Sequence, residues 1–229
     1  MLSIIIPAYN EEKRIGNTLK DYYDYFYVKK VEFEIIVETD GCTDRTVDVV
    51  KSFRKDNIIS LNFANKLGKG KGIIKGLEVA QGDVVGFVDA DESVSPGDFD
   101  KMVSEIGSYE CVIASRRVKG VETVKNWPAK RRIASKMFNM LVNLVLGLNI
   151  RDTQCGAKVF TKRAANIIVS QVKTKGYVFD VDVLWRMKKN NIIVKEFPVK
   201  WIHAREGQLK IRSHAYKMFF ELIKLRFSK

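Results

Sequence analysis

The chain has 229 residues, 46% of them hydrophobic, which is enough to bury a sizeable core in one domain. Lysine and arginine total 40 against 27 aspartates and glutamates, and the net charge of +13 favours an anionic partner: nucleotide phosphates, nucleic acid or an acidic membrane surface. Three cysteines without a Cys-x-x-Cys pair argue against a zinc ribbon or a disulfide framework and are typical of a reducing cytosol.

The first half of the chain alternates strand-like and helix-like patterns. Short apolar runs rich in isoleucine and valine predict buried strands, and the segments after them have helical periodicity or helix-capping chemistry. Four strand–helix units in series predict an open, mostly parallel, Rossmann-like α/β sheet flanked by helices. The expected strands are 2–6, 33–37, 58–63 and 85–88, with helices up to about 25 and over 46–53 and 73–80.

The second half is less regular. The apolar segment 134–148 and the basic amphipathic segment 211–227 both predict helices, which could be ordinary core helices or could lie at an interface. In the last segment, phenylalanines flanked by lysines and arginine suit an anionic lipid surface. Further strands are expected at 111–114 and 192–201, the latter at a sheet edge because of Pro198, and further helices at 161–169 and from 179.

No segment predicts a membrane span. The longest uncharged apolar run, 137–150, is shorter than the ~20 residues that cross a bilayer. A strand-like run follows Met1 directly, so we expect no signal peptide. We therefore expect a cytoplasmic protein that is soluble or peripheral on a membrane.

Two aspartates separated by one small residue follow the strand predicted at 85–88. Because extended side chains alternate, Asp89 and Asp91 emerge on the same side of the chain. Carboxylates at the end of a buried strand are costly unless a cation meets them, and a divalent metal with a phosphorylated ligand would do so. Alone, the pair would also fit a solvated strand-end turn.

Other polar residues follow the predicted strands in the same way. In an open parallel sheet the ligand lies beyond the carboxyl ends of the strands. The segment 7–11, Asp40 and the aspartate pair should therefore converge on one cleft. Taken singly, Glu11 could merely complement a helix dipole, and Asp40 could be a satisfied turn aspartate.

Glycine and lysine alternate over 68–72, superficially as in a phosphate-cradling loop. Gly72 and Ile73 follow Lys71, so the Gly-Lys-Ser/Thr ending of a P-loop is missing and an NTPase is not expected. The segment could be a solvated turn or a cationic loop near a nucleotide. Likewise, the arginine pairs 116–117 and 131–132 could be a solvated basic face or could bind phosphates.

Taken together, these motifs resemble family 2 glycosyltransferases, and the second half resembles their dolichyl-phosphate sugar synthases. The resemblance covers nearly the whole chain. Its first part rests on Pro-Ala-Tyr-Asn-Glu-Glu (7–12), Asp-Gly-Cys-Thr-Asp (40–44), Lys-Gly-Lys-Gly (69–72), Gly-Asp (82–83) and Asp-Ala-Asp (89–91). Its second part rests on Ser-Arg-Arg (115–117), Trp-Pro (127–128) followed by Arg131 and Ser135, Asp-Thr-Gln-Cys-Gly (152–156) and Phe-Asp-Val-Asp (179–182).

The resemblance implies a GT-A fold with an open mixed sheet, and an inverting, metal-dependent transfer of a hexose from a nucleotide sugar to dolichyl or polyprenyl phosphate. The product would be a lipid-phosphate sugar donor for protein glycosylation. The chain would be one domain, 1–229, with a nucleotide-binding half (1–115), an acceptor half (116–210) and a basic interfacial helix (211–229) on the cytosolic face of a membrane.

The resemblance also implies roles for single residues. The nucleotide would be bound by Pro7, Tyr9, Glu11, Asp40, Lys71, Asp89 and Ala90. Mg²⁺ or Mn²⁺ would be bound by Asp91, with Asp89 and Ser93 as further candidates. Arg117, Arg131 and Lys210 would meet the phosphates of donor or acceptor, and Asp91, Arg117, Arg131, Asp152 and Gln154 would be catalytic, the last two by shaping the sugar pocket.

Two departures affect specificity. Thr39 stands where many relatives have an acid, and Ser93 where mannosyl relatives often have an amide ligand. The 152–156 string is more similar to the glucosyl branch, which favours UDP-glucose or UDP-N-acetylglucosamine over GDP-mannose. A family 2 enzyme with a soluble acceptor is another alternative, with Asp182 as its base. A basic nucleic-acid-binding protein is the alternative outside enzymes, but the chain has no known nucleic-acid motif, and we expect no such partner.

Overall fold

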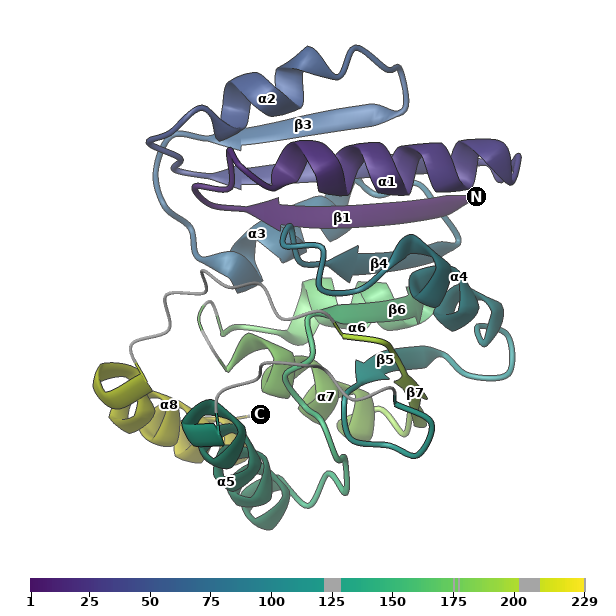
Figure 1. Cartoon of the computed structure of the whole chain (residues 1–229). Coiled ribbons are helices and arrows are strands. Elements are labelled where there is room, and N and C mark those ends of the chain that lie inside the picture. Colours follow the sequence, from purple (N-terminus) through teal and green to yellow (C-terminus); the bar gives the residue numbers. More distant parts are fainter. Residues whose placement is uncertain (122–128, 175, 177, 202–210, 229) are drawn as a thin grey trace.

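The computed structural model describes residues 1–121, 129–174, 176, 178–201 and 211–228, with the backbone alone at 129–131 and 211–215. Its centre is a seven-stranded sheet in the order β3-β2-β1-β4-β6-β5-β7 (Figure 1). The strands are β1 (Leu2–Ala8), β2 (Phe33–Asp40), β3 (Ile58–Phe63), β4 (Val84–Val88), β5 (Cys111–Ser115), β6 (Ala157–Thr161) and β7 (Val194–Pro198).

The sheet is open, mixed and mostly parallel, which confirms the predicted fold class. Strands β1 to β4 pair in parallel, as do β5 and β7, whereas β6 lies antiparallel between β4 and β5. Strand β7, with Pro198 as its last residue, is an edge strand as predicted. Because β6 runs the other way, its beginning meets the carboxyl ends of the other strands.

Helices cover both faces of the sheet. On one face lie α1 (Ile15–Val28), α2 (Thr46–Ser52) and α4 (Pro96–Ser104), and on the other lie α3 (Lys69–Val79), α6 (Lys162–Gln171) and α7 (Phe179–Lys189). Alternate residues of β1 serve the two faces: Ile4 and Ile6 pack with α1, and Ile5 packs with α3. The uninterrupted isoleucine run of β1 therefore reflects a strand that is buried on both sides.

Two helices differ from the sequence prediction. Helix α4 was not expected, although Ser95 caps it by accepting a hydrogen bond from Asp98 N (3.1 Å) and Pro96 opens it. Helix α3 begins at Lys69 rather than at 73, so the glycine–lysine segment is mostly helix and not a loop. A Cβ on Gly70 would lie 2.5 Å from Phe179, and one on Gly76 would lie 2.7 Å from Ile5. The glycines thus allow α3 to pack closely against its neighbours.

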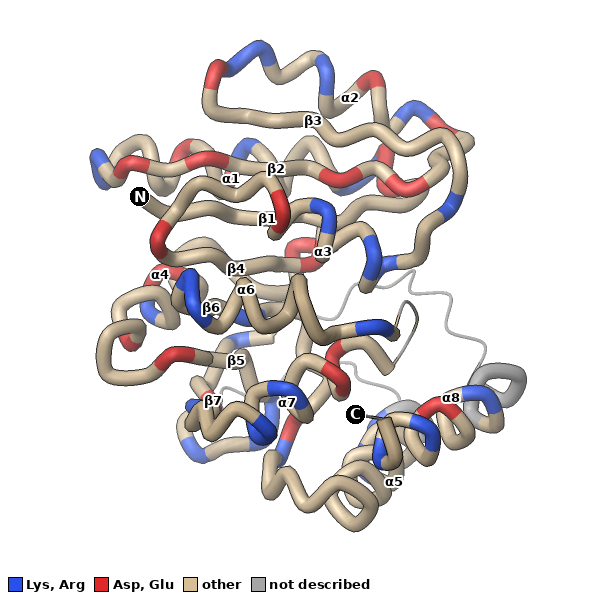
Figure 2. The backbone as a smooth tube through the Cα atoms, turned by 180° about the vertical axis from the view of Figure 1, so that it is seen from behind, with Lys and Arg blue, Asp and Glu red and all other residues tan. Residues whose placement is uncertain are grey.

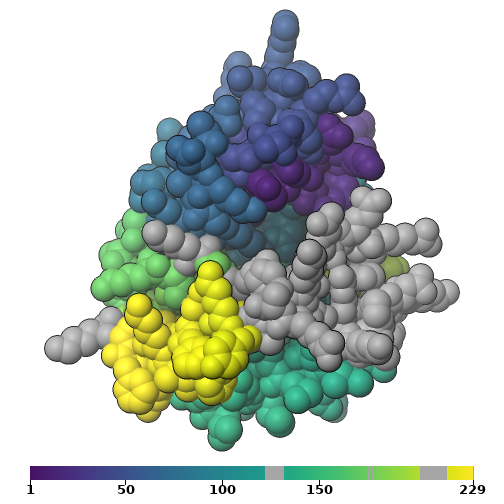
Figure 3. Space-filling model, turned by 90° about the vertical axis from the view of Figure 1, so that its left-hand side faces the viewer, coloured from purple at the N-terminus to yellow at the C-terminus, as the bar shows by residue number. Residues whose placement is uncertain are grey.

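Helices α5 (Ala129–Leu146) and α8 (Ile211–Arg226) form a separate pair, side by side, on the side of the molecule toward which β1, β4 and β5 point (Figures 1 and 3). Val142, Leu222 and Leu225 pack with Val181 and Trp185 of α7 in a third apolar cluster. The sequence places Ile211, Ala215, Met218, Phe219 and Leu222 on one face of α8 at helical spacing. Met218 and Leu222 are in this cluster, Phe219 is exposed, and the side chains of Ile211 and Ala215 lie outside the described part.

Candidate active site

The carboxyl ends of the parallel strands lie along one side of the sheet, here called its carboxyl edge, and Figure 3 views the molecule from this side. Asp89 follows β4 directly, and its backbone N–H donates to the oxygen of Gly156 (3.1 Å), just before β6. A Cβ on Gly156 would lie 1.8 Å from Oδ2 of Asp89. Glycine at this position therefore leaves the space that the Asp89 carboxylate occupies.

Acidic side chains from the loops after β1 and β4 lie close to Asp89. Burial raises the pKa of Glu11, and its ion pair with Arg14 (2.5 Å) lowers it in part. The nearby carboxylates of Asp91 and Asp89 raise it further. The pKa of Asp89 is also raised, first by burial, which Lys69 opposes. Asp91 accepts a hydrogen bond from Ser93 N (3.1 Å). The structure thus brings together the ends of β1 and β4.

Asp40 joins this group through the loop before α3. The carboxylate of Asp40 is buried and accepts hydrogen bonds from the backbone N–H groups of Leu67 and Gly68, the latter at 2.9 Å. The next residue, Lys69, places its Nζ 2.5 Å from Oδ1 of Asp89. Asp40 therefore fixes the backbone that presents Lys69 to Asp89. Sequence reasoning named Lys71 and missed Lys69, because it placed both in a loop.

The remaining predicted nucleotide residues lie along the same edge. Pro7 is in β1, opposite Glu38, and the ring of Tyr9, exposed just beyond β1, lies under Lys66 Nζ at 3.3 Å from its centroid. Ala90 is buried, and its carbonyl accepts from Thr18 Oγ1 (3.1 Å). Contact of these residues with a nucleotide stays a prediction.

Arg116 and Asp152 form a buried, bidentate ion pair. Arg116 Nε and Nη2 donate to Oδ2 (2.7 Å) and Oδ1 (2.8 Å) of Asp152. Glu196 of β7 accepts from the backbone of Arg151 (2.9 Å) and Asp152 (3.0 Å), and so fixes the loop at 151–152. This geometry favours an ordering role for Asp152 rather than direct contact with a sugar. The sequence did not single out Glu196, because no motif marks the edge strand in which it lies.

Arg117 points its guanidinium toward helix α5. Its Nη1 donates to Arg151 O (3.0 Å) and its Nη2 to Ser135 Oγ (2.8 Å). Gln154 is half-buried between Asp152 and β6. The side chains of Arg131 and Lys210 lie outside the described residues, so their predicted phosphate contacts stay predictions.

A buried lysine that the sequence did not single out lies beside the aspartates. Lys158 of β6 is fully buried, and its Nζ donates to Asp180 Oδ1 (2.6 Å) and to the carbonyl of Cys155 (2.9 Å). Asp180, at the start of α7, is close enough to raise the pKa of both Lys69 and Asp89. The Phe-Asp-Val-Asp motif is thus coupled electrostatically to the Asp-Ala-Asp motif.

The donor set fits a divalent ion that also binds phosphate. Within the described part of the chain, no three His, Cys, Asp or Glu side chains lie close enough to hold a metal by themselves. Mg²⁺ in particular is often bound by one or two carboxylates and completes its shell with substrate phosphates and water. Asp91 and Asp89 would supply these carboxylates, and the buried Ser93 remains a candidate without direct support.

Glu38 is the buried acid for which sequence reasoning had no role. It is fully buried in β2, where a Cβ on Gly72 would lie 2.1 Å from its Oε2. Neither carboxyl oxygen meets a hydrogen-bond partner among the residues that the structure describes. Burial, and secondarily Asp40, raises the pKa of Glu38 to about 8. The group is therefore protonated in the folded state near neutral pH.

This raised pKa makes folding stability depend on pH. The folded state holds the Glu38 proton more tightly than the unfolded state, so stability falls as pH rises from about 5 to 8, by up to about 1.4 kcal/mol per pH unit. Glu38→Gln, which copies the protonated acid, should be close to the parent in stability at pH 5 and exceed it by about 4 kcal/mol at pH 8. Denaturant unfolding at both pH values checks this, and an equal pH dependence in both proteins would contradict it.

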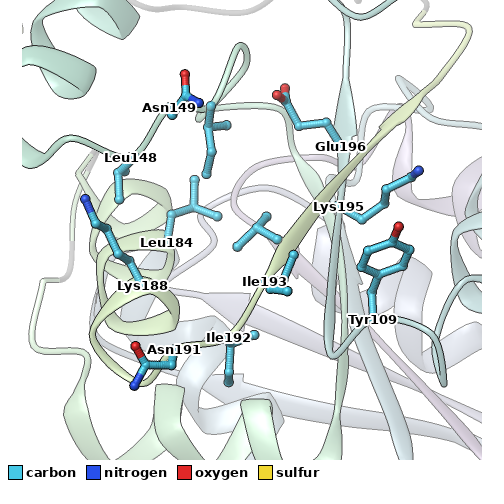
Figure 4. Close-up of a pocket in the computed structure, with 12 residues that line it drawn as sticks. Tyr109, Leu148, Asn149, Leu184, Lys188, Asn191, Ile192, Ile193, Lys195 and Glu196 are labelled. Atoms are coloured by element: carbon cyan, nitrogen blue, oxygen red, sulfur yellow. The ribbon is translucent and has the colours of Figure 1, made fainter.

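The pocket shown in Figure 4 is separate from the predicted site residues. It lies between α7 and the edge strand β7, and its lining includes Tyr109, Lys188, Ile193, Lys195 and Glu196. None of its lining residues belongs to the predicted site. Glu196 connects the two by accepting hydrogen bonds from the backbone of the loop at 151–152.

Known proteins are similar in sequence to most of the chain. A dolichyl-phosphate beta-glucosyltransferase of Trichomonas vaginalis is 31% identical over 237 residues, covering 98% of this chain and 72% of its own length. A UDP-N-acetylglucosamine–dolichyl-phosphate N-acetylglucosaminyltransferase of Methanococcus voltae is 28% identical, covering 100% and 97%. Glycosyltransferase AglD of Haloferax volcanii is 30% identical over 87% of this chain, which spans only 33% of that protein.

Solved structures share the fold. Glucosyl-3-phosphoglycerate synthase from Mycobacterium tuberculosis, crystallised with Mn²⁺, UDP and phosphoglyceric acid, superposes with a TM-score of 0.76 at 16% identity, over 100% of this chain and 79% of that one. This likeness supports the GT-A fold. The sequence profile of Glycosyl transferase family 2 matches residues 3–168. The chain therefore belongs to glycosyl transferase family 2 and is a glycosyltransferase.

Proposed function

We propose that this enzyme transfers a hexose from a nucleotide sugar, UDP-glucose or UDP-N-acetylglucosamine, to dolichyl or polyprenyl phosphate, with inversion at the sugar and with Mg²⁺ or Mn²⁺ as cofactor. The observation that carries the proposal is the cluster of Asp89, Asp91 and Glu11 with Lys69 at the carboxyl edge of the sheet. The two dolichyl-phosphate relatives named above support the acceptor and the choice of donors.

The cluster suits a donor that leaves as a nucleoside diphosphate. Asp91 and Asp89 would hold the divalent ion, which supplies a Lewis acid for the departing diphosphate. Lys69 brings a further positive charge to the same place, at the beginning of α3. Pro7, Tyr9, Glu11 and Asp40 would bind the nucleoside part.

The acceptor does not require a strong base. A phosphate monoester has a second pKa of about 6, so near neutral pH it is largely dianionic and already nucleophilic. It needs positioning between cations, for which Arg117, Arg131 and Lys210 are the candidates. The guanidinium of Arg117 is oriented by Arg151 O and Ser135 Oγ, ready to hold an anion in place.

The structure disfavours the alternative with a soluble hydroxyl acceptor. That reaction would need a carboxylate base, for which Asp182 was the candidate. Asp182 is fully buried and accepts hydrogen bonds from the backbone of Lys173 and Thr174, while its other oxygen pairs with Arg186 (3.1 Å). Its carboxylate therefore fixes the backbone at Lys173 and Thr174 and is not exposed to solvent.

Transfer of label tests the reaction. The protein is incubated with polyprenyl phosphate, Mn²⁺ and radiolabelled UDP-glucose, UDP-N-acetylglucosamine or GDP-mannose in turn. We expect label from one of the UDP-sugars in the organic phase, and none when EDTA replaces Mn²⁺. Label from GDP-mannose alone would assign the mannosyl alternative, and label from no donor would contradict the proposal.

A lipid acceptor would explain the exposed apolar side chains of the α5–α8 pair. Apolar side chains on the outer face of α5 recur at helical spacing, and those of α8 do the same beside them. This outer face consists of Ile133, Met137, Met140 and Leu144 of α5, Tyr216, Phe219 and Phe220 of α8, and Phe227 just after α8, all between 40% and 82% exposed. None of the described helices is long and apolar enough to span a membrane. We infer that the outer face lies on the bilayer that contains the lipid acceptor.

Charge selects an anionic bilayer over a second copy of the chain. Arg132 and Lys136 of α5 and Lys217, Lys224 and Arg226 of α8 are exposed on these helices, and Figure 2 shows basic positions along α8. Two copies meeting through this face would bring like charges together, whereas anionic lipid would attract each Lys or Arg by about 1 kcal/mol. The enzyme would then be peripheral on the cytosolic side of its membrane.

Vesicle binding checks the outer face. We expect the protein to co-sediment with phosphatidylglycerol vesicles at low salt, and less at high salt because the attraction is screened. Leu144→Glu with Phe220→Glu should reduce the bound fraction about tenfold or more, since both apolar area and charge are lost. Ile193→Glu, the same change at an exposed side chain near β7, is the control and should bind like the parent. Equal binding by both variants would contradict the assignment.

A further inference from the structure

Lys69 is the first residue of α3, where a helix favours anions and disfavours cations. The first turn of α3 has no acidic residue that could compensate. Instead, the Lys69 ammonium lies 2.5 Å from Oδ1 of Asp89, on another element, and the side chain is 38% exposed. Lys69 is therefore held in place by the acidic cluster and not by its own helix.

The cluster around Lys69 is nearly balanced in charge. When all are ionised, the carboxylates of Asp89, Asp91 and Asp180 face the ammonium groups of Lys69 and Lys158, which leaves one negative charge. A lysine side chain is charged at physiological pH, and the Lys69 ammonium already occupies Oδ1 of Asp89 at 2.5 Å. A divalent ion that binds Asp89 must therefore compete with a permanent cation.

The two lysines differ in their freedom to move. Lys158 is fully enclosed and is held by Asp180 and the carbonyl of Cys155. Lys69 is partly exposed, and its direct partner is Asp89. Of the two, Lys69 alone can exchange partners without a change in the core.

We propose that Lys69 is an exchangeable cation: it neutralises Asp89 until the donor binds, and then it leaves Asp89 to the divalent ion and pairs with the donor diphosphate. This inference rests on the proposed function. Its consequence is that the metal and the nucleotide bind cooperatively. Metal alone binds weakly because it must displace the ammonium, and the nucleotide gains the displaced ammonium as a partner.

The test measures binding, not turnover. Mn²⁺ affinity is measured by calorimetry without nucleotide, and UDP affinity is measured in saturating Mn²⁺, for the parent and for Lys69→Met. Because an opposite charge within about 4–6 Å changes an ionic equilibrium by a factor of ten or more, we expect Lys69→Met to bind Mn²⁺ alone about tenfold more tightly and UDP about tenfold more weakly. Lys69→Arg, which keeps the charge, should bind both nearly as the parent does.

A matched control lies on the same helix. Lys75 is similarly exposed and pairs with Glu78 (2.5 Å), and Lys75→Met should change neither affinity. Unchanged or weaker Mn²⁺ binding by Lys69→Met, in a parent that binds UDP with Mn²⁺, would overturn the exchange and leave the transferase proposal intact. A parent that binds neither Mn²⁺ nor UDP would overturn both.

Discussion

Asp91→Asn is expected to reduce transfer of the hexose by at least about 10³-fold, because an amide oxygen replaces the carboxylate that we propose holds the cation at the departing diphosphate. Among the described residues, Asp91 accepts a hydrogen bond from Ser93 N, and the carbonyl oxygen of asparagine can accept it as well. The fold should therefore survive, and the loss should be in catalysis. The measurement is the initial rate of label transfer at saturating donor, together with the melting temperature.

Asp83→Asn is the matched control. Asp83 lies just before β4, with its side chain almost fully exposed, and contacts the amino terminus at 3.4 Å. The same chemical change there should leave the rate within about twofold, because exposed ion pairs contribute little. If Asp91→Asn kept more than a tenth of the parental rate, Asp91 would not be the metal ligand.

Gly156→Ala should reduce turnover about 10²-fold through one methyl group, because a shift of about 1 Å in a catalytic group can cost that much. The added Cβ would lie 1.8 Å from Oδ2 and 2.5 Å from Cγ of Asp89. The backbone N–H of Asp89 donates a hydrogen bond to the Gly156 carbonyl, which holds the Asp89 backbone in place. The carboxylate must therefore rotate, which breaks its ion pair with Lys69. The expected signature is a lower kcat and weaker Mn²⁺-dependent UDP binding.

Gly97→Ala provides the comparison. Gly97 lies in α4, and the nearest atom to its added Cβ would be 3.8 Å away, on Tyr25. Alanine is favoured over glycine in helices by up to about 1 kcal/mol, so this variant should be fully active and at least as stable as the parent. Full activity of Gly156→Ala would show that the position of Asp89 does not matter for transfer.

Much of the sheet could be predicted because burial on both faces leaves a strong local signal. The isoleucine runs of β1 and β2 and the acids after them placed the carboxyl edge correctly. The direction of β6 could not be predicted, because five residues in a strand look the same in either orientation. It is this reversal that brings Gly156 against Asp89.

The site was predictable to the extent that strand ends determine it. Asp89, Asp91 and Glu11 converge as expected, and Asp40 joins them through the backbone around Gly68. Lys69 and Lys158 could not be selected from the other lysines, because their roles depend on the start of α3 and on packing across β6. Glu38 also looked like any strand residue, since its missing hydrogen bonds are a tertiary feature.

The central claim is that residues from separate strand ends surround one metal-bound diphosphate, and an anomalous difference map from crystals grown with Mn²⁺ and UDP tests it most directly. We predict a manganese peak in contact with the Asp91 carboxylate, with the UDP diphosphate between it and the beginning of α3. Manganese bound away from both Asp89 and Asp91, or UDP in the pocket beside β7, would contradict the account.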